Sequence, residues 1–475
     1  MKKLLLQLAF LLFPFFALAQ GDVVKDFREK TMGIADVVKV NEHLYVMLVN
    51  QEDQNFELVA VDDKMNDVWH STFKGSGIVV GKFKGSILAI TCADYSRSRG
   101  FTGPYSAYLV DEQSGKLKSQ KVVYQSNASS AESPEAFFNE DGSDFTLIIR
   151  ETGITKSFSP FAQYKFNNTK DFTIIKLNEK LDVNAYKPSV ALEGFAGATV
   201  NYKGDLCIFS IQDDRTLKAS KYDAGKTQPS SSIIQDIDIK KNVSFEDVNY
   251  TNIPSTNDRN IFYFASVHKN PDRDYELSVA KLNFTNGTGT VVNEIFNSAH
   301  VKEIEKGFVP LDKKWKKPDI GPTKELYVYH MEEHNGALLM AMSGTYYARL
   351  GSVMQLFEGA TVINSYDLNL KRNFQQVLPI KYNMDFRLPP SYHADGNNLY
   401  IIANTADGFK MGTLYSQLDL KTGEWVKMEG VEIEKRWMAN QHTLWFKDNF
   451  IQPFIKYSGL LPPQKQAINL QLLTY

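Results

Sequence analysis

The chain has 475 residues, of which 43% are apolar and 23% charged, and this composition excludes a disordered or collagen-like protein. Its 53 basic residues against 55 acidic ones give no overall positive field, so we expect no nucleic-acid partner. Two cysteines are too few for a disulfide scaffold or a four-cysteine zinc site.

Residues 1–19 have the pattern of a secretory signal peptide. Lys2 and Lys3 precede an apolar run that ends in the small-x-small sequence Ala17-Leu-Ala19. We therefore expect cleavage before Gln20, export to the periplasm or the outside of a bacterial cell, and a net charge that moves from −2 to about −4. The alternative is a retained anchor, but the run is shorter than the roughly 20 residues that span a bilayer, and Pro14 interrupts it. No later segment predicts a transmembrane span.

After the leader the sequence indicates an all-β protein, because short runs rich in Val, Ile, Tyr, Phe and Leu alternate with polar turns. One strongly apolar strand recurs eight times, as residues 44–49, 87–90, 145–149, 206–209, 261–264, 337–342, 399–402 and 450–455. Seven of these are followed by a hairpin with an Asp or Asn turn, centred on Asp62, Asp111, Asn178, Asp223, Asn283, Asp367 and Asp419. Asp and Asn favour such turns because their side chains accept hydrogen bonds from the turn backbone.

Four strands repeated around an axis predict a β-propeller. The eighth unit lacks its fourth strand after Ile468–Leu472, while an isolated strand at Val23–Phe27 begins the mature chain. We predict eight four-stranded blades in one domain, residues 20–475, with the N-terminal strand closing the ring. Seven blades, or two β-sandwiches in tandem, are the alternatives, since the repeat spacing is irregular.

The hairpin around Asp419, Thr422, Gly423 and Trp425 resembles the repeats of secreted bacterial quinoprotein-like β-propellers, which are loosely similar to WD40 repeats. Asp62 and Trp69 form a looser copy. The resemblance implies the propeller architecture over most of the chain, and it implies no quinone or other cofactor.

In a propeller, the connection between the second and third strands of each blade lies on the same face as the links between blades. Three of these connections are long and irregular: residues 94–106, 150–170 and 343–361. Long loops on a rigid scaffold commonly carry function, and Arg and aromatic residues are enriched at recognition sites. The candidate ligand-binding residues are Tyr95, Arg97, Arg99, Phe101, Tyr105, Phe158, Phe161, Tyr346, Tyr347 and Arg349. Alternatively, these aromatic side chains fold back and pack the loops onto the blades.

His330-Met-Glu-Glu-His334 matches a zinc hydrolase motif that requires a helix. The segment follows a strand and precedes Asn335-Gly336, so we expect strand, turn and strand, and no metal site. Residues 139–144 likewise indicate a turn rather than a calcium loop.

The basic run Lys313–Lys317 is expected to be a solvated loop, preceded by a short helix over 299–306 with Ser298 and Gly307 as caps. Cys92 and Cys207 fall in two blades that are not adjacent, so we predict two buried thiols with no disulfide. Nucleophile-elbow, phosphate-loop and dinucleotide motifs are absent.

These patterns favour a secreted, non-catalytic, monomeric propeller that binds a protein or glycan through its long-loop face. An enzyme acting on a polysaccharide, with acid and base from several blades, and a structural component of a cell-envelope assembly are the alternatives.

Overall fold

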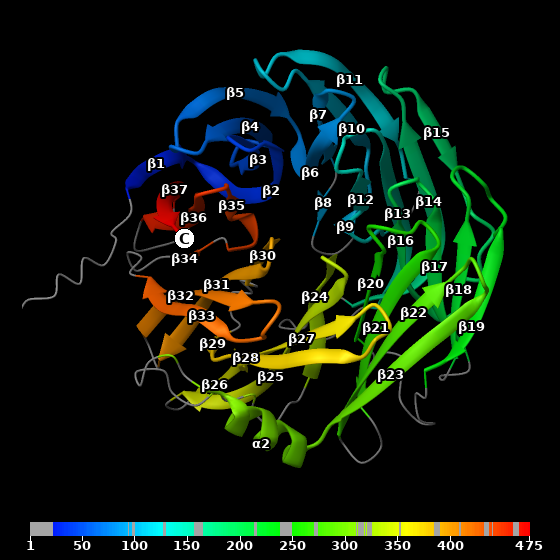
Figure 1. Cartoon of the computed structure of the whole chain (residues 1–475). Helices are drawn as coiled ribbons and strands as arrows, with labels where there is room; N and C mark the ends of the chain where they lie inside the picture. Colours follow the sequence, from blue (N-terminus) through cyan, green and yellow to red (C-terminus); the bar gives the residue numbers. More distant parts are fainter. Residues whose placement is uncertain are drawn as a thin grey trace, which may run out of the picture.

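The computed structural model describes residues 22–93, 95–96, 100–126, 130–155, 165–212, 216–237, 249–269, 274–309, 311, 318, 320, 325–350, 353–383, 390–407, 410–431, 437–438, 440–458 and 465–475. The eight predicted apolar strands all form, and each is the second strand of a four-stranded antiparallel blade. The blades follow one another around a ring (Figure 1). The prediction of an eight-bladed propeller is therefore confirmed, and the seven-bladed and sandwich alternatives are excluded.

Each of the first seven blades runs in chain order from its innermost strand to its outermost. Blades 1 to 4 comprise β2 (Thr31–Asn41), β3 (Leu44–Gln51), β4 (Asn55–Asp62) and β5 (Asp67–Lys74); β6 (Ser76–Phe83), β7 (Ser86–Cys92), β10 (Tyr105–Val110) and β11 (Leu117–Tyr124); β12 (Glu135–Phe138), β13 (Phe145–Thr155), β14 (Lys165–Leu177) and β15 (Val183–Tyr186); and β16 (Phe195–Val200), β17 (Leu206–Gln212), β18 (Thr216–Tyr222) and β19 (Ser231–Asp236).

Blades 5 to 7 comprise β20 (Asn249–Pro254), β21 (Ile261–Lys269), β22 (Tyr275–Asn283) and β23 (Thr288–Phe296); β24 (Glu325–His334), β25 (Ala337–Leu350), β27 (Thr361–Asp367) and β28 (Arg372–Leu378); and β30 (Ser391–Asp395), β31 (Asn398–Asp407), β32 (Lys410–Asp419) and β33 (Trp425–Val431). Blade 8 contains β34 (Trp437–Met438) and β35 (Leu444–Trp445), then β36 (Asn449–Ser458), β37 (Lys465–Thr474) and β1 (Val23–Glu29). Outside the blades lie β8 (Tyr95–Ser96), β9 (Gly100–Phe101), β26 (Val353–Glu358), β29 (Tyr382–Asn383), the helix α2 (Ser298–Gly307) and the 3₁₀ turn η2 (Asn440–His442).

The N-terminal strand β1 closes the ring, as predicted, by pairing antiparallel with β37 from Val23↔Gln471 to Glu29↔Ala467. Val24 and Phe27 pack against an apolar cluster shared by blades 8 and 1. Arg28 then ties the closing strand to blade 1, because its Nε lies 3.0 Å from the carboxylate of Glu57 and its Nη2 lies 2.6 Å from that of Asp67.

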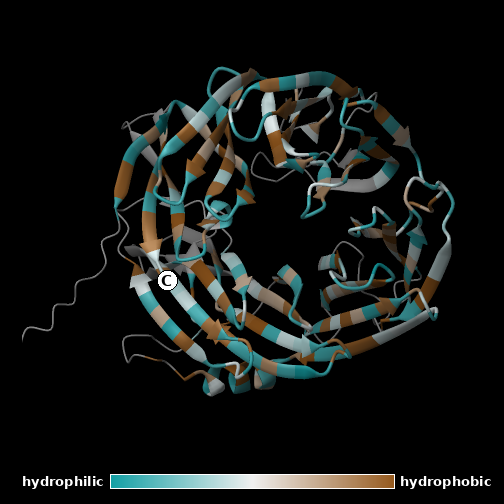
Figure 2. Ribbon diagram, turned by 45° about the horizontal axis from the view of Figure 1, so that its top comes forward, coloured by the Kyte–Doolittle hydropathy of each residue, from teal (hydrophilic) through white to brown (hydrophobic). Residues whose placement is uncertain are grey.

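The core lies between neighbouring blades. Middle strands are covered on both faces and are apolar almost throughout, as in β7, where every residue is buried. The outermost strand β23 alternates exposed and half-buried residues along most of its length, and the outer ribbons in Figure 2 alternate hydrophilic and hydrophobic residues. Cys92 and Cys207 are buried thiols on β7 and β17, and they form no disulfide, as predicted.

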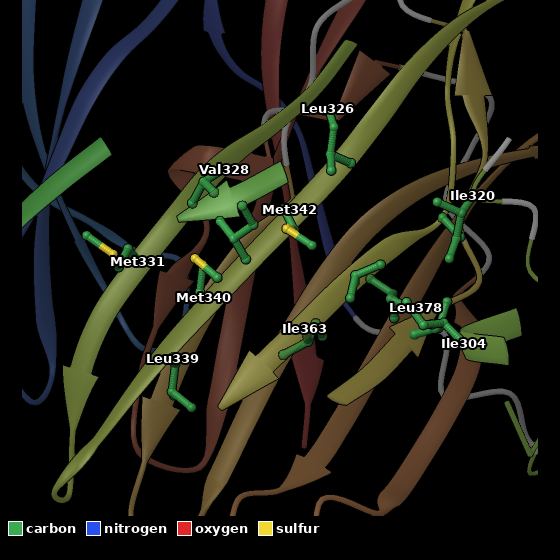
Figure 3. Close-up of a cluster of buried hydrophobic side chains, with 14 of the residues drawn as sticks. Ile304, Ile320, Leu326, Val328, Met331, Leu339, Met340, Met342, Ile363 and Leu378 are labelled. Atoms are coloured by element: carbon green, nitrogen blue, oxygen red, sulfur yellow. The ribbon is translucent and has the colours of Figure 1, made fainter. Parts of the chain in front are cut away.

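The helix α2 joins blades 5 and 6; it begins one residue earlier and ends one residue later than predicted, with Phe308 rather than Gly307 as its C-cap. Its N-cap is Asn297 rather than Ser298, because the Asn297 side chain accepts hydrogen bonds from the backbone N–H groups of Ala299 and His300. Ile304 anchors the helix in the core of blade 6 beside Ile320 and Leu378 (Figure 3). Among the described residues, no helix is long and apolar enough to cross a membrane.

Candidate functional site

The ring has two different rims. Connections between first and second strands and between third and fourth strands form the turn rim. Connections between second and third strands, together with the links between blades, form the long-connection rim. All three long segments singled out in the sequence belong to the long-connection rim.

Two of these segments are more regular than we expected, which corrects the prediction of irregular loops. The ladder between β13 and β14 continues to Thr155↔Lys165, and β25 continues into a ribbon with β26 that ends at Leu350↔Val353. Both ribbons extend beyond the pairing of the innermost strand, which ends at Glu135↔Ile148 in blade 3 and at Glu325↔Thr345 in blade 6. These blades therefore carry two-stranded extensions on the long-connection rim.

The long connection of blade 2 turns inward and lies near the centre of the ring, where β8 and β9 are seen in Figure 1. The Phe101 backbone N–H donates a 3.0 Å hydrogen bond to the Ala131 carbonyl, in the link that enters blade 3. The Tyr105 side chain is fully buried, and its hydroxyl donates to the Phe101 carbonyl at 2.5 Å. Phe101 packs partly buried against the same core. These two candidate residues therefore fasten the connection to blades 2 and 3.

The other candidate residues fall into two groups. The backbones of Tyr95, Tyr346, Tyr347 and Arg349 lie in β8 and β25, while their side chains are outside the described part of the structure. Arg97, Arg99, Phe158 and Phe161, with the basic run 313–317 and the leader 1–19, lie outside the described residues.

A group of charged and aromatic side chains on the long-connection rim joins three successive blades. We call Glu132, Glu135, Arg150, Phe195 and Tyr250 the rim cluster. Arg150 Nη2 lies 2.6 Å from a carboxylate oxygen of Glu132 and 2.7 Å from one of Glu135. The Arg150 guanidinium also lies over the Phe195 ring, 5.3 Å from its centroid.

The strands position this cluster directly. Arg150 lies on β13 at the point where the ladder leaves the body of blade 3, and its carbonyl accepts a 3.1 Å hydrogen bond from the Glu132 backbone N–H. Glu135, Phe195 and Tyr250 lie at or next to the starts of β12, β16 and β20, the innermost strands of blades 3, 4 and 5. Since every innermost strand starts at the same rim, these side chains meet close to the axis.

Burial controls the charge of the rim cluster. Burial raises the pKa values of the Glu132 and Glu135 carboxyls, and the Arg150 charge opposes that rise without cancelling it. Burial also raises the pKa of the Tyr250 phenol, on which Arg150 and both glutamates act electrostatically. With two carboxylates and one guanidinium, the ionised cluster is acidic, and the side chain of Arg150 is 17% exposed.

The sequence did not reveal the rim cluster. Its residues lie on three blades, and no periodic signal connects Glu132, Arg150 and Tyr250. One local feature could have drawn attention to Arg150: it is a charged residue that directly follows the apolar strand of blade 3.

The His330–His334 segment forms strand, turn and strand, as predicted: β24 runs to His334, and Asn335 and Gly336 turn with positive φ. His330 stacks on Tyr392 of blade 7, with ring centroids 4.4 Å apart, whereas Glu333 accepts a 2.8 Å hydrogen bond from Asn257 of blade 5. The motif residues thus contact different neighbours. Within the described residues, no group of three or more His, Cys, Asp or Glu side chains is arranged to hold a metal ion.

No family model matches this chain, and no curated protein matches its sequence. Solved structures with a similar fold are propellers of low sequence identity. The WD40 domain of SCAP from fission yeast is 10% identical over 96% of this chain and 98% of that one, with a TM-score of 0.43. Sqt1 from Chaetomium thermophilum, solved bound to the N-terminus of ribosomal protein L10, is 8% identical over 94% and 100%, with a TM-score of 0.45. The polysaccharide lyase Uly1 is 11% identical over 93% and 90%, with a TM-score of 0.42.

Proposed function

We propose that this protein is a non-catalytic binding propeller and that a protein partner docks on its long-connection rim, with the rim cluster near the centre of the interface. The observation that carries the proposal is the meeting of an arginine, two partly desolvated carboxylates and two aromatic residues from three blades. Arginine and tyrosine are the residue types that most often dominate binding energy. The acidic balance of the cluster favours a partner that presents a basic side chain.

Two matched double variants test this proposal. Glu135→Gln with Arg150→Met removes both ion pairs of the rim cluster, because Arg150 is the partner of Glu132 as well as of Glu135. Lys427→Met with Glu429→Gln removes an ion pair from the outermost strand of blade 7. The mature chain and both variants are immobilised and exposed to the envelope fraction of the producing cells. We expect one stoichiometric protein that is captured at least about tenfold less by the rim variant and equally by the control. Equal capture by the rim variant contradicts the proposal.

The polysaccharide enzyme alternative is tested with the same proteins. Glu132 and Glu135 both contact one nitrogen of Arg150, so they do not face each other across a space for a sugar. We therefore expect no release of reducing ends or unsaturated sugars from a polysaccharide panel. Product release that is lost in the rim variant would replace the binding proposal with a catalytic one, and retention of a glycan without turnover would replace the protein partner.

We also propose that the protein is exported through residues 1–19. The support is the charged and apolar leader with its Ala17-Leu-Ala19 end. N-terminal sequencing of the protein from its native cells should begin at Gln20. A mature chain that retains Lys2 and Lys3 would contradict export by a cleaved leader.

A further inference from the structure

A pocket of about 530 Å³ lies on the outer perimeter of the ring, where α2 passes between blades 5 and 6. Its walls come from β22 and β23 of blade 5, from β27 and β28 of blade 6, and from His300 of α2. The volume is within the range of small-molecule sites in proteins. Because its residues lie on the outer strands, the pocket is separate from the rim cluster, and a ligand bound there would add to the proposed function.

One end of the pocket is polar and is organised around a single carboxylate oxygen. Glu294 Oε1 lies 2.5 Å from Arg372 Nη1, 2.7 Å from His300 Nε2 and 3.1 Å from Gln375 Nε2. These contacts join blade 5, α2 and blade 6, so the polar groups are held in place before a ligand arrives. Pre-organised groups of this kind reduce the entropy cost of binding.

Arg372 provides the donor group for an anion at this end of the pocket. Arg372 alone balances the charge of Glu294, and the Arg372 side chain is 42% exposed, which leaves guanidinium N–H groups accessible. Both ring nitrogens of His300 face carboxylates, Nε2 at 2.7 Å from Glu294 and Nδ1 at 3.8 Å from the exposed Glu303, so this ring orients Glu294. The first turn of α2 carries no acidic side chain, so the positive end of the helix dipole adds to the attraction of Arg372 for an anion.

The other end of the pocket is apolar. Leu277 and Leu370 are 1% exposed and form its inner wall, and Ile295 stands at the surface with 44% of its area exposed. The accessible apolar side chains are therefore Ile295 and the half-buried Val292, and an apolar ligand body that lies against them would remove apolar surface from water.

We propose that this pocket binds a small organic carboxylate, with its apolar body against Val292 and Ile295 and its carboxylate at Arg372. A carboxylate suits this end because the planar guanidinium offers paired donors to its two oxygens. Glu294 remains in place and orients the arginine.

The test is isothermal titration of the mature protein with three probes of one shape: 3-phenylpropionate, its neutral amide, and the cation 3-phenylpropylamine. We expect saturable binding of the carboxylate and at least about tenfold weaker binding of the amide and the amine. Arg372→Gln should weaken carboxylate binding by about tenfold or more, whereas Lys371→Gln, the adjacent exposed lysine, should not change it. Equal binding of the amine, no saturation by the carboxylate at about 10 mM, or full binding by Arg372→Gln would overturn the proposal.

A second variant keeps the test valid if loss of the Arg372 ion pair unfolds blade 6. Ile295→Trp enlarges an exposed side chain at the mouth of the pocket and leaves the ion pairs in place. It should block 3-phenylpropionate while the melting temperature stays unchanged. Unaltered binding by this folded variant would show that the probe sits elsewhere, and the pocket assignment would be wrong.

Discussion

The turn rim and the long-connection rim are built from the same strands, yet their connections differ in how similar they are from blade to blade. On the turn rim the same local chemistry recurs: Asp62, Asp367 and Asp419 each accept a hydrogen bond from the backbone N–H two residues later, at 2.8 to 2.9 Å. On the long-connection rim each blade differs, from the short link between Gln51 and Asn55 to the extended ribbon of β13 and β14. The turn rim repeats one type of Asp-capped turn from blade to blade. The long-connection rim has connections of different length and shape on the same blades.

The turn rim also joins the blades to one another. Trp69 Nε1 of blade 1 donates a 3.0 Å hydrogen bond to the Glu112 carbonyl in the turn of blade 2, and the Gly115 backbone lies against the Trp69 ring. The same arrangement recurs where Gln376 of blade 6 donates to the Gly423 carbonyl of blade 7. Gly115 and Gly423, which have no Cβ, therefore allow one blade to approach the next.

Opening the ring should have the largest effect, because both rims depend on its closure. A chain that begins at Lys30 lacks β1 and the contacts of Val24 and Phe27. We expect it to lose at least about 3 kcal/mol of unfolding free energy and to aggregate through the exposed edge of β37. Urea unfolding and size-exclusion chromatography against a chain that begins at Asp22 measure both effects. An unchanged midpoint would show that β1 does not seal the ring.

A pair of glycine variants separates contacts between blades from local backbone strain on the turn rim. Gly115 and Gly225 both have positive φ, but a Cβ at Gly115 would lie 2.4 Å from the Trp69 ring, whereas Gly225 has nothing within 4 Å. Gly115→Ala should cost about 3 kcal/mol, from strain and overpacking, and Gly225→Ala about 1 kcal/mol, from strain alone. Equal losses in denaturant titrations would mean that the turn of blade 2 does not support blade 1.

A buried carboxyl between the two rims, that of Asp36, is expected to make the stability of the fold depend on pH. It lies on β2, accepts hydrogen bonds from the backbone N–H groups of Val37 and Val80, and burial raises its pKa to about 6. Since the folded-state pKa lies above the unfolded value, this group stabilises the fold below about pH 4, and that stabilisation is lost as the pH rises through about 6.

We therefore expect the unfolding free energy of the wild type, relative to Asp36→Asn, to fall by up to about 3 kcal/mol between pH 4 and pH 7. Urea unfolding at several pH values measures this difference. A constant difference across the range would show that the Asp36 carboxyl is not desolvated.

The smallest effect is expected for a single turn cap. The Asp62 carboxylate accepts hydrogen bonds from the backbone N–H groups of Lys64 and Asn66, at 2.9 and 2.8 Å. Asp62→Ala should cost about 1 kcal/mol, and Asp62→Asn, which keeps one acceptor oxygen, should cost less. Neither variant should alter partner capture, because the turn rim lies opposite the rim cluster. Loss of capture by Asp62→Ala would break the distinction between the two rims.

The sequence was informative where the structure depends on local signals. The apolar middle strands, the Asp and Asn turns and the closing pair of terminal strands each have a pattern that spans only a few residues. The helix was also found, but Asn297 and Ser298 are both good N-caps, so the sequence could not decide its first residue.

The sequence was less informative where distant contacts decide the structure. Asn167 and Asn168 favour a loop, yet they lie in β14, and Asn167 pairs with Gly153, because β13 offers an adjacent backbone. The rim cluster depends on how three blades place Glu135, Arg150 and Tyr250 around an axis. Such a juxtaposition is a property of the closed ring, and no segment of the sequence contains it.

The pairing of β1 with β37 has a further consequence for attachment. The Leu472 backbone N–H donates a 2.9 Å hydrogen bond to the Asp22 carbonyl, so residue 22 and the last residues of the chain lie together on the turn rim of blade 8. A linker or affinity tag fused at either position would leave from the side away from the rim cluster. Immobilised through such a handle, the propeller would present its variable side outward, and a pulling force applied at both handles would unzip the closing ladder one rung at a time.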